Sequence, residues 1–141
     1  MTGIDRRCVL VLDLDAARCA AGAAASLDRP VALLSARDGA LTAGIGWFDA
    51  ILRAARFHAR GADLIGILDC GDRADLVQMA WRQGIEAAIY RGPASVADRL
   101  DGIARRAGGT LLQRRPRAIE VGDPADIAGL AARLGRVRRA S

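Results

Sequence analysis

The sequence predicts one α/β domain built around a mostly parallel sheet. Short apolar runs alternate along the chain with segments of helical periodicity, the order expected of repeated strand–helix units. The apolar runs lack a polar face, which is typical of parallel strands covered on both sides. At 141 residues and 52% hydrophobic composition, the chain is long and apolar enough for one such core. We therefore expect a doubly wound, Rossmann-like or flavodoxin-like sheet of about five strands with helices on both faces.

The apolar runs give the expected strands. They are short, rich in Val, Ile and Leu, and bounded by charged residues, Gly or Pro, as buried strands are. The expected strands cover residues 8–14, 31–35, 64–68, 85–90 and 110–113, with residues 118–121 as a short additional strand. A partial (β/α) barrel is the architectural alternative, although about five strands are too few to close one.

Helical periodicity fills the intervals between these runs. Helices are expected over residues 16–27, 47–60, 74–83, 96–107 and 124–135. Ser95 and Asp123 occupy the N-cap positions of the last two, and Pro124 suits a first helical position. Residues 1–135 thus form a single α/β domain, and residues 136–141 form a basic C-terminal tail.

The basic residues are all arginine, which excludes several kinds of enzyme. Lys and Arg together number 21, none of them is Lys, and the formal net charge is +5. Without lysine there is no side-chain Schiff base, no Walker-type phosphate loop and no serine–lysine catalysis. The arginines crowd the C-terminus and offer a surface to an acidic partner. Aromatic side chains are not interleaved with them, so the pattern does not favour nucleic acid.

The cysteines and the hydropathy pattern favour a cytoplasmic protein. Cys8, Cys19 and Cys70 lack metal-type spacing and are expected to be reduced thiols. Asp13 and Asp15 interrupt the apolar run near the N-terminus, which argues against a signal peptide. No apolar run approaches the ~18 residues that a membrane span needs, so no membrane partner is expected.

Polar side chains follow the expected strands and form the candidate site. The connections that leave parallel strands gather at one edge of a sheet, the usual place for a ligand cleft. Residues 64–75 show this most clearly, because their apolar run ends abruptly in acidic residues. The candidate ligand-binding residues in these connections are Asp13, Asp15, Ser35, Arg37, Asp69, Cys70, Asp72, Arg91 and Ser95.

The stretch after the second expected strand adds a glycine-rich loop to this edge. Residues 35–46 make a longer connection than most strand–helix loops, and such loops commonly serve as lids or binding loops. Gly44 and Gly46 permit positive φ or a close approach of the backbone to a ligand. Gly46 also stands before an expected helix start, where free N–H groups favour anions. Both glycines therefore join the candidate ligand-binding residues.

Three of these motifs resemble those of haloacid dehalogenase-like phosphatases. Residues 9–15 (VLVLDLD) are similar to the family's first motif, apolar residues followed by Asp-x-Asp. Residues 33–35 (LLS) are similar to the second motif, and residues 71–75 (GDRAD) to the fourth. The family's lysine has no counterpart, so an arginine such as Arg37 or Arg91 would have to neutralise the phosphate charge.

The resemblance implies a role for each matching residue. Asp13 stands at the position of the nucleophile, Asp15 at that of the general acid/base, and Ser35 at that of a phosphate ligand. A magnesium ion would be the cofactor, held by Asp13, Asp72 and Asp75. Taken without the resemblance, the residues themselves predict no cofactor and no metal ligands.

Three functional hypotheses follow from the sequence. The first is binding of a small anionic molecule or a protein partner, with no clear catalytic set. The second is a magnesium-dependent phosphatase or phosphotransferase of the kind just described. The third is a protein-interaction or assembly module that uses the Arg-rich C-terminus, including assembly with copies of itself. The sequence leaves open whether the chain is an enzyme.

Overall fold

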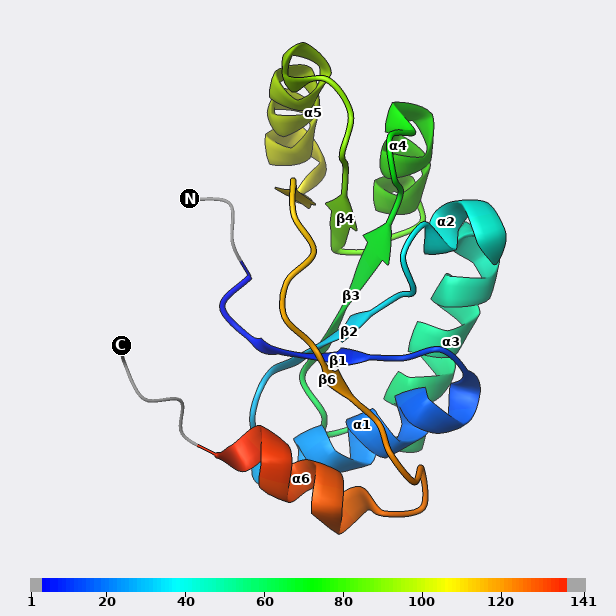
Figure 1. Ribbon diagram of the computed structural model, residues 1–141, viewed down its shortest axis with the longest axis vertical. Coiled ribbons are helices and arrows are strands. Elements are labelled where there is room, and N and C mark those ends of the chain that lie inside the picture. The colour runs from blue at the N-terminus through cyan, green and yellow to red at the C-terminus, as the bar shows by residue number, and fades with distance from the viewer. Residues whose placement is uncertain (1–3, 137–141) are drawn as a thin grey trace.

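The computed structural model describes residues 4–136 (Figure 1). Helices and strands alternate along the chain, except for one pair of consecutive helices and, near the C-terminus, one pair of consecutive strands. In chain order the elements are β1 (Arg7–Leu10), α1 (Leu14–Leu27), β2 (Val31–Leu34), α2 (Gly39–Thr42), α3 (Ile45–His58), β3 (Leu64–Asp69), α4 (Ala74–Arg82), β4 (Ala87–Ile89), α5 (Ala94–Ala107), β5 (Thr110–Leu112), β6 (Ile119–Glu120) and α6 (Ile127–Gly135).

The strands form one six-stranded sheet in which every neighbouring pair is parallel. The order across the sheet is β5-β4-β3-β2-β1-β6, so the first five strands lie in sequence order and β6 adds to the outer side of β1. The register pairs Cys8 of β1 with Ala32 of β2, and Val9 of β1 with Ile119 of β6. The predicted parallel α/β fold is confirmed, and β6 is the additional strand.

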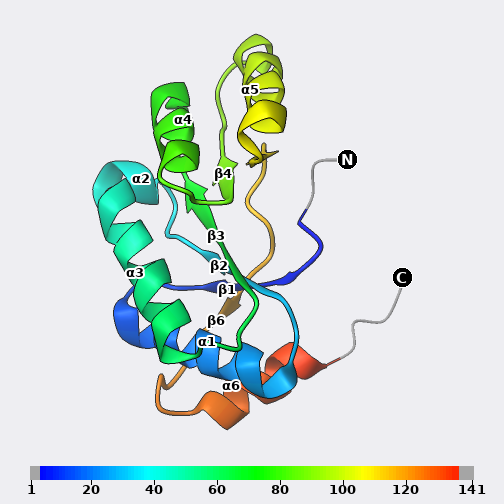
Figure 2. The ribbon, with the colours of Figure 1, turned by 180° about the vertical axis from the view of Figure 1, so that it is seen from behind.

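The helices gather on one face of this sheet, which differs in detail from the expected placement on both faces. Buried residues from each of α1 to α6 belong to a single core cluster that includes one face of the strands. Figures 1 and 2 show the helices as an arc along one side of the curved sheet. From β1 to β5, each strand lies beside its predecessor in the same direction. Right-handed connections of that kind carry every intervening helix to the same side.

The opposite face of the sheet is covered by segments without helices. Its core cluster is made of the strand residues Cys8, Ala32, Leu34, Ile67, Ala87, Ile89 and Leu112. Ile4, before β1, and Ala118, between β5 and β6, pack against it. Residues 113–118 run from the carboxyl end of β5 to the amino end of β6, at opposite edges of the sheet (Figure 1). This connecting segment therefore reaches both ends of the strands.

The first strand is shorter than predicted because a helix cap ends it. The expected strand over residues 8–14 stops at Leu10, and α1 already begins at Leu14. Asp13 is the N-cap of α1, and its carboxylate accepts a hydrogen bond from the amide of Ala16 at 2.8 Å. Asp13, a candidate ligand-binding residue of the sequence analysis, thus has a structural partner within the fold.

Other helix starts also differ from the prediction. The expected loop over residues 35–46 contains the short helix α2, and Gly46 lies in the first turn of α3 rather than ahead of it. Helix α5 begins at Ala94, so Ser95 lies inside the helix and is not its N-cap. Asp126, not Asp123, caps α6 and accepts a hydrogen bond from the Gly129 amide at 2.9 Å.

Within residues 4–136, no helix combines the length and the hydropathy that crossing a membrane requires. Of the predicted basic tail, residues 136–141, only Arg136 belongs to the part of the chain that the structure describes.

Candidate functional site

The carboxyl ends of three neighbouring strands bring polar residues together, as predicted. Ser35 follows β2, Asp69 ends β3 and Arg91 lies just beyond β4. These strands are adjacent in the order β4-β3-β2, so their connections meet at the same edge. Asp69 lies at the centre of this group, and its side chain is fully buried.

The buried carboxylate of Asp69 is bound by two arginines. Its Oδ2 accepts hydrogen bonds from Nη1 of Arg91 and from Nη1 of Arg115, each at 2.8 Å. Its Oδ1 accepts one from the amide of Gly71 at 3.0 Å. Burial by itself would raise the pKa of Asp69, but the hydrogen bonds from the two guanidinium groups outweigh it and lower the pKa below its usual range.

Both arginines make a second contact that closes the network. Nη2 of Arg91 donates to Oδ1 of Asp38 at 2.8 Å, and Nη2 of Arg115 donates to the carbonyl of Ser35 at 3.0 Å. The Ser35 hydroxyl accepts from the amide of Asp69 at 2.9 Å and donates to the carbonyl of Ala36. We call Ser35, Asp38, Asp69, Arg91 and Arg115 the carboxyl-edge cluster. Its two carboxylates balance its two guanidinium groups.

Gly71 allows Asp38 to lie close against the chain that follows β3. Its φ of +60° lies in the left-handed region, where a side chain is disfavoured. A Cβ on Gly71 would also lie 2.5 Å from Oδ1 of Asp38. The glycine after β3 thus serves the close packing of the Asp38 loop against the strand end.

Asp38 and Arg115 are the members of the cluster that are not among the candidate residues of the sequence analysis. Asp38 lies in the predicted loop at this edge, whereas Arg115 was assigned to no site. It lies in the connecting segment of residues 113–118, which has no periodic pattern and stands among other arginines. The available signal was Asp69 itself, because a carboxylate at the end of a buried strand needs cations close to it. The sequence analysis assigned Arg37 and Arg91 to this edge, and the second cation that binds Asp69 is instead Arg115, 46 residues away in the sequence.

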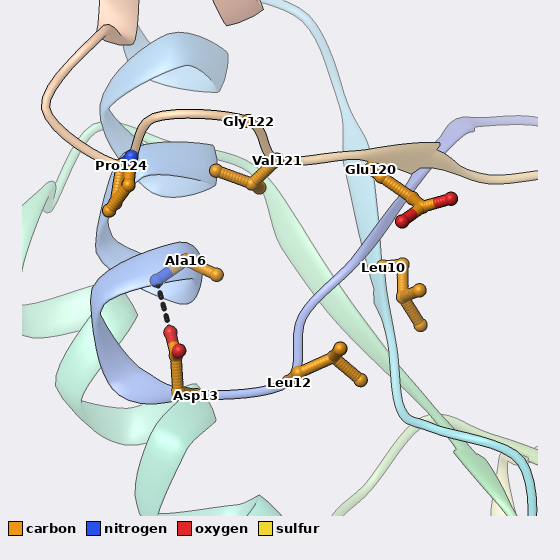
Figure 3. A pocket seen from close by; sticks show the side chains of 8 residues that line it. All are labelled: Leu10, Leu12, Asp13, Ala16, Glu120, Val121, Gly122 and Pro124. Atoms are coloured by element: carbon orange, nitrogen blue, oxygen red, sulfur yellow. Dashed lines mark hydrogen bonds between the residues drawn. The ribbon is translucent and has the colours of Figure 1, made fainter.

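A small cavity rimmed by acids opens at the carboxyl ends of β1 and β6. It has a volume of about 120 Å³ and is lined by Leu10, Leu12, Asp13, Ala16, Glu120, Val121, Gly122 and Pro124. Figure 3 shows Asp13 and Glu120 on opposite sides of it, with the two leucines between them. We call it the acid-rimmed cavity. Its middle is apolar, and its two carboxylates lie at the margins.

A second cavity lies on the other side of Leu12. It has a volume of about 110 Å³, and its walls include Leu12, Thr42, Trp47, Phe48 and Leu68. We call it the Trp47 cavity. Leu12 and Trp47 are 57% and 42% exposed, so large apolar side chains remain in contact with water at this edge. Leu41 of α2 is 47% exposed as well.

The remaining predicted residues stay outside the carboxyl-edge cluster. Asp15, Arg37, Asp72 and Ser95 are exposed, and within residues 4–136 their side chains make no hydrogen bond to the cluster. Gly44, with a φ of +97°, is the N-cap of α3. No atom would crowd a Cβ at Gly44 or at Gly46, so neither marks a close approach.

Cys70 is placed as a core residue. Its side chain is fully buried, and burial, with further contributions from Asp69 and Asp75, raises the pKa of its thiol to about 12. A thiol in this state is not ionised near neutral pH and makes a poor nucleophile. Cys8 and Cys19 are also free and buried.

The acids that the phosphatase resemblance assigns to magnesium are not gathered. Within residues 4–136 no group of three or more His, Cys, Asp or Glu side chains is arranged to hold a metal ion. Asp13 caps α1, and the Asp75 carboxylate binds Arg73 at 2.9 and 2.7 Å on the exposed side of α4. The geometry therefore gives no support to a magnesium site made by Asp13, Asp72 and Asp75.

Known proteins provide no further evidence about this site. No protein-family description matches the chain, and no curated protein shows significant similarity to it in sequence.

Proposed function

We propose that this chain is a binding module that recognises a segment of a partner protein at the carboxyl edge of its sheet. In that segment, an apolar residue lies next to a basic residue. The observation that carries the proposal is the pair of cavities on either side of Leu12, one apolar and one rimmed by carboxylates. The apolar residue would enter the Trp47 cavity, and the basic residue would enter the acid-rimmed cavity.

The sizes of the two cavities support single side chains as their occupants. A buried apolar cavity of about 150 Å³ holds a benzene molecule, so about 110 Å³ beside Trp47 suits one aliphatic side chain. Tryptophan is enriched among the residues that dominate protein–protein affinity, and such residues cluster in well-packed pockets. Leu12 and Trp47, which share the Trp47 cavity, are both exposed, and burial of their apolar surface would favour association.

The charges around the acid-rimmed cavity support a basic neighbour in the partner. Asp13, Asp15, Glu120 and Asp123 are all exposed on this side of the edge. A Lys or Arg of the partner would lay its aliphatic stem against Leu12 and Val121 while its head reached Asp13 or Glu120. The arginines of the carboxyl-edge cluster do not compete for the acids, because Asp38 and Asp69 already bind them.

A displayed-peptide selection on the immobilised chain tests this proposal. We expect the selected peptides to share an apolar residue beside Lys or Arg. Trp47→Ala should weaken binding of such a peptide by about 30-fold, the loss typical of an anchor residue. Glu120→Gln should weaken it several-fold, and more at low salt than at high salt.

Phe57→Ala is the matched control, because Phe57 is an aromatic residue 71% exposed that lines neither of the two cavities. The Phe57→Ala variant should bind the selected peptides with the same affinity as the unmodified chain. Equal losses in Trp47→Ala and Phe57→Ala would show nonspecific adhesion to exposed aromatics and overturn the proposal. A selection that enriches no peptide would overturn it as well.

A further inference from the structure

A groove lined by three arginines lies at the opposite end of the sheet from the carboxyl-edge cluster. It has a volume of about 420 Å³ and is lined by Arg6, Arg7, Cys8, Arg117, Ala118 and Ile119. These residues belong to the amino ends of β1 and β6, which are neighbouring parallel strands, and to the chain just before each strand. No acidic side chain lines this groove. We call it the arginine groove.

The three arginines differ in how their charge is compensated. Nη1 of Arg6 binds Asp63, at 2.9 Å from the carboxylate and 3.2 Å from the carbonyl. Nη1 of Arg7 donates to the carbonyl of Arg136 at 3.1 Å, a contact that fixes the side chain without cancelling its charge. Within residues 4–136, Arg117 makes no hydrogen bond or ion pair, and it is exposed.

We propose that the arginine groove binds a small soluble molecule that carries a phosphate monoester. The three guanidinium groups carry three positive charges, and Asp63 compensates the charge of Arg6. About two positive charges remain, which match the charge of roughly −1.5 to −2 on a phosphomonoester at neutral pH. A planar guanidinium group can donate two parallel hydrogen bonds to two oxygens of one phosphate. The groove is larger than a phosphate alone needs and falls in the size range of sites for small organic ligands.

The walls of the groove favour a small molecule over a nucleic acid strand. Its uncharged lining is Cys8, Ala118 and Ile119, which offer a short apolar floor. None of the lining residues is aromatic, whereas sites for single-stranded nucleic acid stack bases on aromatic rings. A phosphodiester also carries one negative charge per phosphate and matches the groove less well than a monoester does.

Two of the three arginines are held in place before any ligand arrives. The contacts of Arg6 with Asp63 and of Arg7 with Arg136 restrict two long side chains that would otherwise lose rotamer freedom on binding. Arg117 is then the side chain free to close on the phosphate. Its removal should therefore weaken binding while leaving the fold intact, because it makes no hydrogen bond or ion pair within residues 4–136.

Isothermal titration of the full chain with glycerol 3-phosphate, at constant ionic strength, tests the inference. We expect saturable binding, tighter than that of dimethyl phosphate, which carries a single charge. Arg117→Gln should weaken binding by at least about tenfold, the loss expected for charge-assisted hydrogen bonds. Arg105→Gln removes the same charge from an exposed position of α5 and should bind as the unmodified chain does.

The outcomes that would overturn the inference are distinct. If Arg105→Gln and Arg117→Gln lose affinity equally, the binding reflects net charge and not the groove. The absence of saturable binding by glycerol 3-phosphate would also refute it. If a labelled oligouridylate binds more tightly than the monoester and depends on Arg117, the groove is a nucleic acid site. Peptide binding at the carboxyl edge should be unaffected in Arg117→Gln, so this inference and the proposed function fail separately.

Discussion

The two ends of the sheet use arginine in opposite ways. At the carboxyl ends, Arg91 and Arg115 both bind the buried Asp69 through Nη1. Their Nη2 atoms donate to Asp38 and to the carbonyl of Ser35, respectively. At the amino ends, three arginines line the arginine groove, and only one of them, Arg6, is paired with a carboxylate, that of Asp63. The first arrangement satisfies its charges internally, and the second leaves positive charge facing water.

A structural ion cluster differs from a ligand site in how its charge is balanced. Both ends present arginines close to strand termini, and residue type alone does not separate them. The balance of charge within hydrogen-bonding distance does, because a buried charge must be paired while an exposed one need not be. By this criterion Asp69 and its arginines hold the fold together, whereas Arg117 is available to a ligand.

Asp69→Asn should have the largest effect on stability. The substitution removes the negative charge between two guanidinium groups that are only 22% and 24% exposed. Breaking a buried pair in this way typically lowers the free energy of unfolding by about 3–5 kcal/mol. Urea unfolding followed by circular dichroism measures the change. A loss below about 1 kcal/mol would show that the cluster is not what locks this end of the sheet.

Asp63→Asn and the pH dependence provide controls for that measurement. Asp63 is 64% exposed and pairs with Arg6 at the other end, so its substitution should cost less than about 1 kcal/mol. The pKa of Asp69 is lowered in the folded state, so its carboxylate stabilises the fold above the unfolded pKa of about 4. The stability difference between the unmodified chain and Asp69→Asn should therefore shrink as the pH falls below about 4.

Arg115→Gln and Arg117→Gln compare the two ends within one connecting segment. Arg115 binds Asp69 and the carbonyl of Ser35, so its loss should cost about 1.5–3 kcal/mol of unfolding free energy. Arg117 is exposed in the arginine groove, and its loss should change stability by no more than about 0.5 kcal/mol. Thermal and urea unfolding of both variants measure the contrast. Similar costs for the two would contradict the distinction drawn between the ends.

The parallel sheet was predictable because its signals are local. Apolar runs followed by turn residues mark each strand from β1 to β5, and parallel pairing then places Ser35, Asp69 and Arg91 at one edge. The placement of the helices was not predictable in the same way. It depends on the order of the strands, because β1 to β5 lie side by side in sequence order, and no local pattern encodes that order.

The site was predicted where its residues lie at or just beyond the ends of β2, β3 and β4, and it was missed where Arg115 follows β5. Arg115 comes from a segment without periodicity, and its contact with Asp69 spans 46 residues of sequence. The arginine groove depends on β6 bringing Arg117 beside Arg6 and Arg7, a long-range pairing of the same kind. Asp13 shows the reverse error, because a carboxylate that caps a helix has the same sequence pattern as one that binds a ligand.

Substitutions of Asp13 should have the smallest effect on stability, and they distinguish two roles of its carboxylate. As the N-cap of α1 it accepts a hydrogen bond from Ala16, so Asp13→Ala should lower the free energy of unfolding by about 1 kcal/mol. Asn is as good an N-cap as Asp, and Asp13→Asn should therefore keep the stability within about 0.5 kcal/mol of the unmodified chain. Urea unfolding of the two variants measures both values.

The same asparagine variant removes the negative charge from the acid-rimmed cavity. If that charge attracts the basic residue of a partner, Asp13→Asn should weaken binding of the selected peptides while the fold stays as stable as before. Unchanged peptide affinity in this variant would assign Asp13 wholly to the fold, like Asp69, and leave Glu120 as the acid that recognises the partner. The comparison between the two ends would then rest on three acids, because Asp13, Asp38 and Asp69 would all serve the fold at the carboxyl edge.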